Sequence, residues 1–120
     1  MVNEEGPVRV RTTGTVTPDM PELARRRVAA VLRHVGEPVL FANVMLVVAP
    51  DPAVERPAIA WATVSVNGRV VRAHATGTTM PQAIGALAAR LRIRVDRAWS
   101  ERDHRRWQAQ AGQRRVQRRV

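Results

Sequence analysis

A short segment in the middle of the chain constrains the fold more than any other part of the sequence. Residues 58–76 read AIAWATVSVNGRVVRAHAT, so that two alternating, strand-like runs flank the dipeptide Asn67-Gly68. This dipeptide is typical of a two-residue type I′ hairpin, because both turn residues then adopt positive φ angles that Asn and Gly tolerate. The segment therefore predicts two antiparallel strands joined at Asn67 and Gly68.

The same turn predicts which residues pair across the hairpin. The expected pairs are Val66 with Arg69, Val64 with Val71, Ala62 with Ala73 and Ala60 with Ala75. Because successive side chains alternate between the two faces of a strand, these pairs form a small, apolar face suited to close helix packing. The opposite face carries Trp61, Thr63, Val70, Arg72 and His74. His74 is opposite Trp61 there, and we expect the two rings to stack on an exposed sheet.

The remaining segments predict two more strands and two helices. Residues 8–16 alternate Val with Arg and residues 39–48 form an apolar run, as expected of strands, whereas the proline-rich residues 49–57 favour a surface loop. Apolar residues at helical spacing follow Pro21 and Pro81. The two apolar stripes comprise Ala24, Val28, Val31, Leu32 and Val35 in the first helix, and Met80, Ile84, Leu87, Ala88, Leu91, Val95 and Ala98 in the second.

Short signals mark where these helices begin and end. The pairs with capping-box spacing are Asp19 with Glu22 and Thr79 with Gln82, and the residues that close the first helix are Gly36 and Pro38. The resulting order is β-α-β-β-β-α. It predicts an α+β domain over residues 1–103, with a four-stranded sheet and two helices packed on one face.

Charge is the compositional feature that says most about function. The 120 residues carry 20 basic and 10 acidic side chains, a formal net charge of +10, and all the bases are arginines. Guanidinium groups stay charged and bind phosphate in a bidentate fashion, so this balance favours nucleic acid as the partner, ahead of an anionic membrane surface. Solubility alone is the simpler explanation, although net charges of about 2 to 8 in magnitude usually suffice for a small domain.

Composition also argues against several function classes. The chain has no Cys, its three His are scattered without metal-site spacing, and none of them has an evident acid or nucleophile partner in the sequence. No apolar run approaches the roughly 18 residues of a membrane span. We therefore expect a cytoplasmic protein that is not an enzyme and has no cofactor, metal, small-molecule substrate or membrane partner.

Arginines gather on both predicted helices. In the second helix Arg90, Arg94 and Arg97 share one flank at i, i+4 and i+7, whereas Arg92 is expected to pair with Asp96. A solvated polar face is the ordinary explanation for one such helix. However, the segment from Arg90 to the C-terminus holds eleven Arg against three acids, which favours contact with nucleic acid.

The first helix adds a second group of candidate contacts, Arg25, Arg26, Arg27 and Arg33. A short charge run of this kind is most often a solvated face. If the two helices lie side by side on the sheet, however, their outward arginines would merge into one basic surface.

Residues 104–120 differ in composition from the rest of the chain. They contain no acid and end in QRRVQRRV, a repeat typical of a frayed helix end, a flexible basic arm or a linker. Arg105, Arg106 and Trp107 are candidate tail contacts to RNA. Any of the three Trp can stack on a base, but Trp99 is expected to pack at the end of the second helix.

Over about residues 7–99 the sequence resembles the N-terminal domain of the ribosome hibernation-promoting factors and ribosome-associated inhibitors. Such proteins have a Thr-led, basic first helix, here Thr17 followed by ARRRVAAVL, and a hairpin like VSVNGRVVRAHAT. Their second helix has a motif close to Asp-Met-Tyr-x-Ala-Ile-Asp, which here reads TMPQAIG. The matching positions are Met80, Ala83, Ile84, Arg90, Leu91 and Val95, and the departures are Thr79, Pro81 and Gly85.

This resemblance implies a non-enzymatic protein that binds the small ribosomal subunit between head and body. It would overlap the sites of messenger RNA and tRNA and silence idle ribosomes under stress. The rRNA-binding residues expected on this basis are Arg25, Arg26, Arg27, Arg33, Arg90, Arg94 and Arg97. Long family members carry a C-terminal domain that pairs ribosomes, so this chain would be a short member or part of a long one, and any dimer would form through that absent domain.

Two other functions agree with the same residues. A sheet backed by two helices also describes a general double-stranded RNA-binding module. A structural or assembly domain, whose basic tail keeps it in solution or touches membranes, is the third hypothesis.

Overall fold

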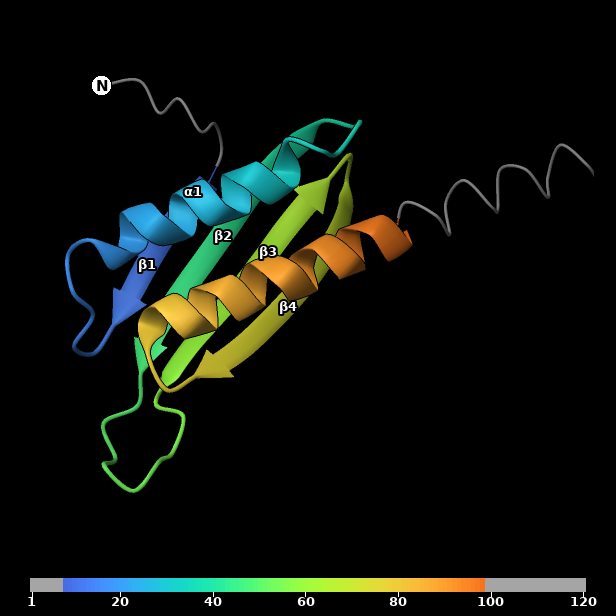
Figure 1. Ribbon diagram of the computed structural model, residues 1–120. Coiled ribbons are helices and arrows are strands. Elements are labelled where there is room, and N and C mark those ends of the chain that lie inside the picture. The colour runs from blue at the N-terminus through green and yellow to red at the C-terminus, as the bar shows by residue number, and fades with distance from the viewer. Residues whose placement is uncertain (1–7, 99–120) are drawn as a thin grey trace, which may run out of the picture.

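The computed structural model describes residues 8–98, and Figure 1 shows how their elements are arranged. The elements are β1 (Val8–Thr13), α1 (Met20–Leu32), β2 (Val39–Val48), β3 (Ala58–Val66), β4 (Arg69–Gly77) and a second helix described over residues 80–98. The predicted order β-α-β-β-β-α and the α+β class are thus confirmed. Trp99 and the predicted tail contacts Arg105, Arg106 and Trp107 lie outside the described residues.

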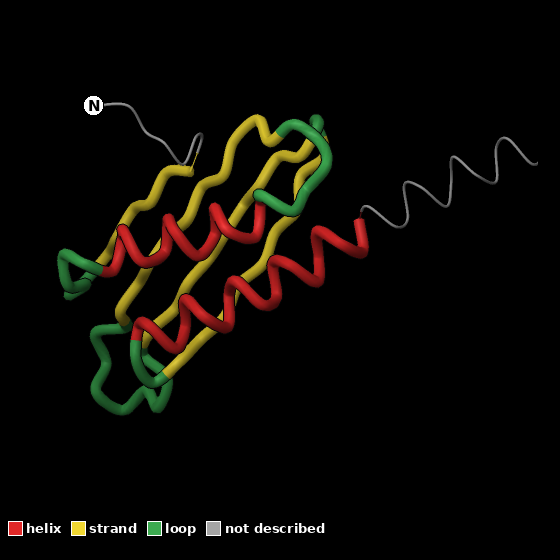
Figure 2. The backbone as a smooth tube through the Cα atoms, turned by 45° about the horizontal axis from the view of Figure 1, so that its top comes forward, coloured by secondary structure: helices red, strands yellow, loops and turns green. Residues whose placement is uncertain are grey.

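The four strands form one mixed sheet in the order β1-β2-β3-β4. β1 and β2 are parallel, and α1 makes the crossover between them, as a parallel pair requires. β2, β3 and β4 follow as antiparallel neighbours. Both helices lie on the same face of this sheet, α1 over β1 and β2 and the second helix over β3 and β4 (Figures 1 and 2).

The hairpin has the predicted register. Val64 pairs with Val71, Ala62 with Ala73 and Trp61 with His74. The turn residues Asn67 and Gly68 have φ angles of 50° and 84°, the positive values that a type I′ turn needs. Local sequence therefore determined the pairing of β3 with β4 residue by residue.

One core lies between the sheet and the helices. The helix-facing side of β3 and β4 is largely alanine, which lets the second helix approach the sheet closely, and leucines and isoleucine from that helix fill the layer between. The largest fully buried side chains include Leu46, Ile84, Leu87 and Leu91. Among the described residues, no helix is long and apolar enough to span a membrane.

The ends of α1 and β1 differ from the prediction. The expected capping box at Asp19 is wrong, because its side chain makes no capping hydrogen bond and the carboxylate of Glu22 binds Arg25 instead. α1 ends at Leu32, before the predicted closure at Gly36. β1 ends at Thr13 rather than at residue 16, since the next residue, a glycine, turns the chain with φ 85°.

The start of the second helix agrees with half of the predicted capping box. The backbone N–H of Gln82 donates to Thr79 Oγ1 at 3.3 Å, as an N-cap should. The returning bond goes one residue further back, because Gln82 Oε1 accepts from the backbone N–H of Thr78 at 2.7 Å and from its hydroxyl at 2.9 Å.

Candidate nucleic-acid interface

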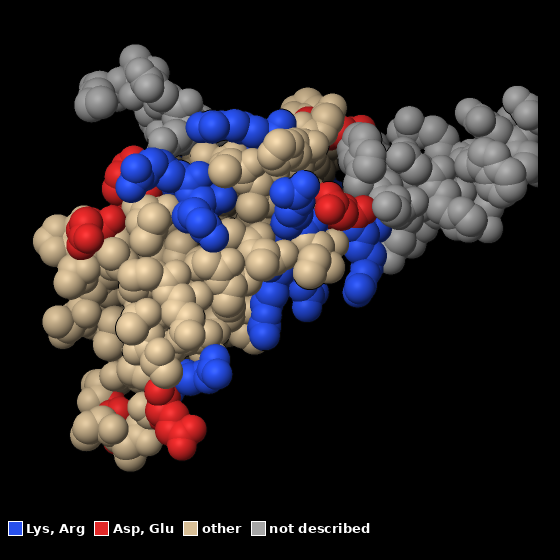
Figure 3. Space-filling model, in the orientation of Figure 1, with Lys and Arg blue, Asp and Glu red and all other residues tan. Residues whose placement is uncertain are grey.

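The two helices form an outward layer, here called the helix layer, that carries most of the predicted contacts. Figure 3 shows arginines gathered over both helices on this face. The exposed ones are Arg26, Arg27, Arg33, Arg90, Arg92, Arg94 and Arg97, and Arg25 is half-buried. The layer thus brings together all seven arginines predicted as contacts, but it divides them into three groups.

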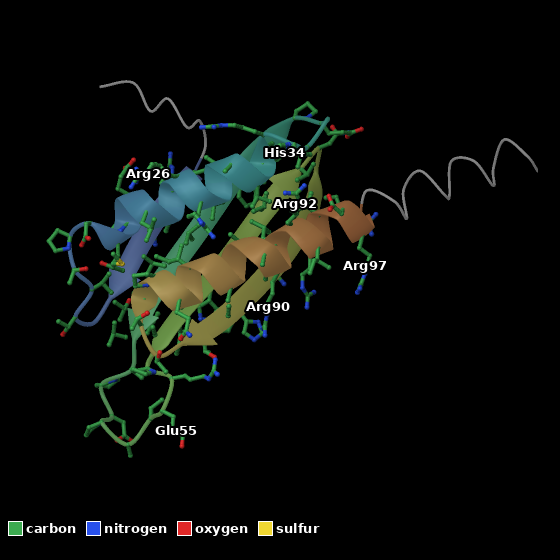
Figure 4. All side chains as sticks on the ribbon, in the orientation of Figure 1. Arg26, His34, Glu55, Arg90, Arg92 and Arg97 are labelled. Atoms are coloured by element: carbon green, nitrogen blue, oxygen red, sulfur yellow. The ribbon has the colours of Figure 1, made fainter. Side chains whose placement is uncertain are left out.

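The first group lies on the outer flank of α1. Helical spacing puts Arg26 and Arg33 seven residues apart on this flank, and the side chain of Arg26 points away from the second helix (Figure 4). Arg25 belongs to the same flank but is bound by Glu22, with 2.8 Å between Nη1 and Oε2. Arg25 is therefore the least available arginine of this group.

The second group is the predicted stripe on the second helix. Arg90 and Arg97 lie on the flank beside β4, on the far side from α1 (Figure 4), and Arg94 shares that flank by its i+4 spacing. Arg90 has a structural task as well, because its Nη1 donates to the backbone carbonyl of His74 in β4 at 2.9 Å. A guanidinium has further donors, so this bond leaves part of Arg90 free for a ligand.

The third group lies in an open groove between the helices. This groove, of about 290 Å³, is lined by Arg27, Ala30, Val31, His34, Gly85, Ala88, Ala89 and Arg92. On the side of the second helix the groove is lined by small residues. Gly85 is close to α1 there, because a Cβ built on it would meet Arg27 Nη2 at 3.5 Å. Two guanidinium groups and one imidazole thus border a hollow that alanine and glycine keep open.

Arg92 and His34 are the site residues that the sequence analysis missed. Arg92 was expected to pair with Asp96, but within the described part of the chain these two side chains form no ion pair. Arg92 points instead toward α1 and His34 (Figure 4). The prediction was wrong because it considered the second helix alone. The groove that Arg92 borders exists only because α1 lies beside that helix.

A spacing signal for the groove was present in both helices. The groove residues recur at i, i+3, i+4 and i+7 along the edge of each apolar stripe, and all but Val31 are small or basic: Arg27, Ala30, Val31 and His34 in α1 and just after it, and Gly85, Ala88, Ala89 and Arg92 in the second helix. Because alanine and glycine have short side chains or none, they leave the space between the two helices unfilled at these positions. The groove also divides the single basic surface that the sequence suggested.

Within residues 8–98, no helix lies over the opposite face of the sheet (Figures 1 and 2). This face carries the predicted ring pair, Trp61 and His74, stacked with centroids 5.1 Å apart and planes at 26°. Among residues 8–98 there is no group of three or more His, Cys, Asp or Glu side chains placed to hold a metal ion.

Solved structures of other proteins share this architecture, a four-stranded mixed sheet with two helices on one face. A ribosomal subunit interface protein from Coxiella burnetii shares it with a TM-score of 0.65 and 15% identity, over 78% of this chain and 97% of that one. The N-terminal domain of Protein Y from Thermus thermophilus shares it with a TM-score of 0.58 and 22% identity, over 75% of this chain and 92% of that one. No family model matches the sequence, and no curated protein matches it. The comparisons therefore show the fold, and it is the fold that the sequence resemblance implied.

Proposed function

We propose that the protein binds the small ribosomal subunit through its helix layer, occupies the channel for messenger RNA and tRNA, and so silences idle ribosomes in the cytoplasm. The observation that carries the proposal is a fold shared with a ribosomal subunit interface protein, joined to an arginine-bearing helix layer. The tail residues Arg105, Arg106 and Trp107 remain candidate contacts of the same kind.

The helix layer suits phosphate groups rather than base edges. Its arginines, all exposed except the half-buried Arg25, lie in three lines along the helices, the two outer flanks and the groove. Guanidinium groups in such lines neutralise successive phosphates and release counterions, which gives binding that depends steeply on salt and little on sequence. Ribosomal RNA presents a dense array of phosphates that this arrangement matches.

Silencing by occlusion needs no chemical step. A folded domain in a channel excludes messenger RNA and tRNA by its volume, and its affinity decides how long the ribosome stays idle. The proposal accordingly assigns no catalytic residue and no cofactor to this chain.

The test is cosedimentation of the full chain with purified ribosomal subunits at two salt concentrations. The variant Arg94→Glu, Arg97→Glu reverses two outer-flank charges and leaves the bond between Arg90 and His74 intact. We expect its affinity to fall by about tenfold or more, and the slope of log affinity against log salt to shrink by about 0.7 to 0.9 for each phosphate that the variant no longer neutralises.

The matched control compares two single variants of equal charge change, Arg94→Glu and Arg56→Glu. Arg56 is exposed in the loop between β2 and β3, where Figure 4 labels its neighbour Glu55, and it lies outside the helix layer. Equal affinity of these two variants would remove the helix layer from the proposal. Competition by free duplex RNA as strong as by subunits would instead support the general double-stranded RNA-binding module.

A further inference from the structure

The open face of the sheet is built from two complete rows of side chains. Strand register places Arg11, Met45, Trp61 and His74 side by side in one row, and Arg9, Asn43, Thr63 and Arg72 in the next. These eight residues are here called the sheet platform. Each row crosses all four strands, a width of about 14 Å at the usual strand spacing.

The platform is accessible in the structure. Six of its residues are exposed, and Met45 and Thr63 are half-buried, whereas their neighbours along the strands, such as Val44 and Ala62, are buried toward the helices. Both helices cover the other face (Figures 1 and 2). The indole of Trp61, which stacks on His74, is still 51% exposed and presents a large apolar surface on the open face.

The side chain of Trp61 is preorganised for contact with a planar ligand. It stacks on His74 across the strands, which restricts the rotation of its side chain before any ligand binds. A ring whose position is already restricted loses less entropy on binding. Met45, the register partner of Trp61 on β2, supplies a soft apolar contact beside this ring, and Thr63, two residues along β3 in the other row, supplies a hydroxyl.

Charge on the platform has a definite arrangement. Cationic or ionisable side chains stand at the two edges of both rows, Arg9 and Arg11 on β1 and Arg72 and His74 on β4, and the ring and the amide of Asn43 lie between them. The four strands contain no acidic residue at all. A strand of nucleotides has the complementary pattern, with anionic phosphates outside and planar bases within.

We propose that the sheet platform binds unpaired nucleotides of RNA, with a base stacked on Trp61 and phosphates bound by the edge arginines. Four-stranded sheets of this width stack two or three bases on aromatic side chains in other RNA-binding domains. Duplex RNA keeps its bases stacked inside the helix and offers nothing planar to this surface. The inference goes beyond ribosome binding by the helix layer, since it assigns a separate ligand to the opposite face.

A second copy of the chain is the other occupant that an apolar patch suggests, and charge argues against it. Two platforms face to face would bring together arginines from both copies, in a chain whose net charge is +10. No acidic residue on the strands would offset that repulsion.

The experiment measures binding of the full chain to a single-stranded oligouridylate of about ten nucleotides, a usual site size for such surfaces, and to a duplex RNA of about sixteen base pairs. Trp61→Thr keeps a strand-forming residue but removes the ring. It should weaken oligouridylate binding by about tenfold, the scale of one base stacked on an aromatic ring, and change duplex binding less than about twofold. Trp61→Phe, which keeps a ring, should recover part of the affinity.

The control on the same face is Val70→Thr, which changes an exposed aliphatic side chain outside the platform. It should leave oligouridylate binding unchanged, and circular dichroism should show all three variants folded. Unchanged oligouridylate affinity in folded Trp61→Thr would overturn the proposal. So would a dimer of the wild-type chain, detected by sedimentation, that Trp61→Thr dissociates.

The outcome is separable from that of the proposed function. Ribosome cosedimentation of Trp61→Thr reports on the helix layer, and oligouridylate binding of Arg94→Glu reports on the platform. Loss of oligouridylate binding in Arg94→Glu as large as in Trp61→Thr would also contradict a separate platform.

Discussion

The helix layer and the sheet platform are both rich in arginine, yet they hold it in different ways. On the helix layer, the arginines lie in three lines, and small residues such as Gly85 and Ala88 leave space in the groove between the helices. The long arginine side chains can therefore adjust to a phosphate backbone. On the platform, strand register fixes the spacing of Arg9 and Arg72 around a central ring. In both proposals arginine binds phosphate, and the neighbouring side chains make the difference, because only the platform has an exposed ring on which an unpaired base can stack.

A shared core joins these two surfaces, and a cavity in it should damage both, the largest effect we expect. Leu91 is fully buried on the side of the second helix that faces the sheet. Leu91→Ala should lower the free energy of unfolding by about 2–5 kcal/mol, because the removed methyl groups leave a cavity that the packed core fills only in part. Urea unfolding followed by circular dichroism measures this destabilisation.

The control for the core variant is Leu40→Ala, which shortens a side chain that is 60% exposed. Its effect should stay within about 0.5 kcal/mol. If Leu91→Ala weakened only one of the two binding activities while the chain remained folded, the surfaces would not depend on one cooperative core.

The groove distinguishes the helix layer from the platform, and Gly85→Ala tests it with a smaller effect. Replacing a mid-helix glycine by alanine should raise the free energy of unfolding by about 0.5–1 kcal/mol, because glycine loses more backbone entropy on folding. The added methyl group would meet Arg27 Nη2 at 3.5 Å and narrow the groove. Ribosome affinity should therefore fall by about twofold to fivefold, as one hydrogen bond weakens, while oligouridylate binding is unchanged.

Gly36→Ala is the matched control, since a Cβ there meets nothing within 4 Å. Higher stability together with unchanged ribosome affinity in Gly85→Ala would show that the groove takes no part in binding. Thermal unfolding and cosedimentation of the same preparations provide both measurements.

Sequence reasoning succeeded where the controlling interactions are local. The Asn67-Gly68 turn determines the pairing of β3 with β4, and each helical stripe faces the core as its spacing predicts. The stacking of Trp61 on His74 followed from that register alone. Both results need only backbone geometry and the alternation of side chains.

The errors arose where one residue has two possible partners. Glu22 was expected to cap α1 but binds Arg25, and Arg92 was expected to pair with Asp96 but borders the groove. The alternative partners of Glu22 differ little in free energy, and the surroundings of Arg92 depend on α1, which is distant in the sequence. The groove itself needs two helices at a particular separation, which the spacing in either helix alone does not specify.

The pair of Arg25 and Glu22 provides the smallest of these tests of the helix layer. Their side chains are 27% and 52% exposed, so Glu22→Gln should change the free energy of unfolding by less than about 0.5 kcal/mol, as expected for a solvated ion pair. The change removes the carboxylate that binds Arg25 and so raises the net charge of the helix layer by one. Ribosome affinity should rise by about twofold at low salt and by less at high salt, because screening weakens interactions between exposed charges.

Glu55→Gln is the matched control, since it makes the same charge change in the loop between β2 and β3. Its effect on ribosome affinity should be smaller, because Glu55 lies away from the helices (Figure 4). Equal gains in the two variants would indicate that net charge alone, rather than the position of Arg25 on the helix layer, governs the affinity. Neither variant should change oligouridylate binding by as much as the removal of Trp61, because stacking depends on the ring and only weakly on a distant carboxylate.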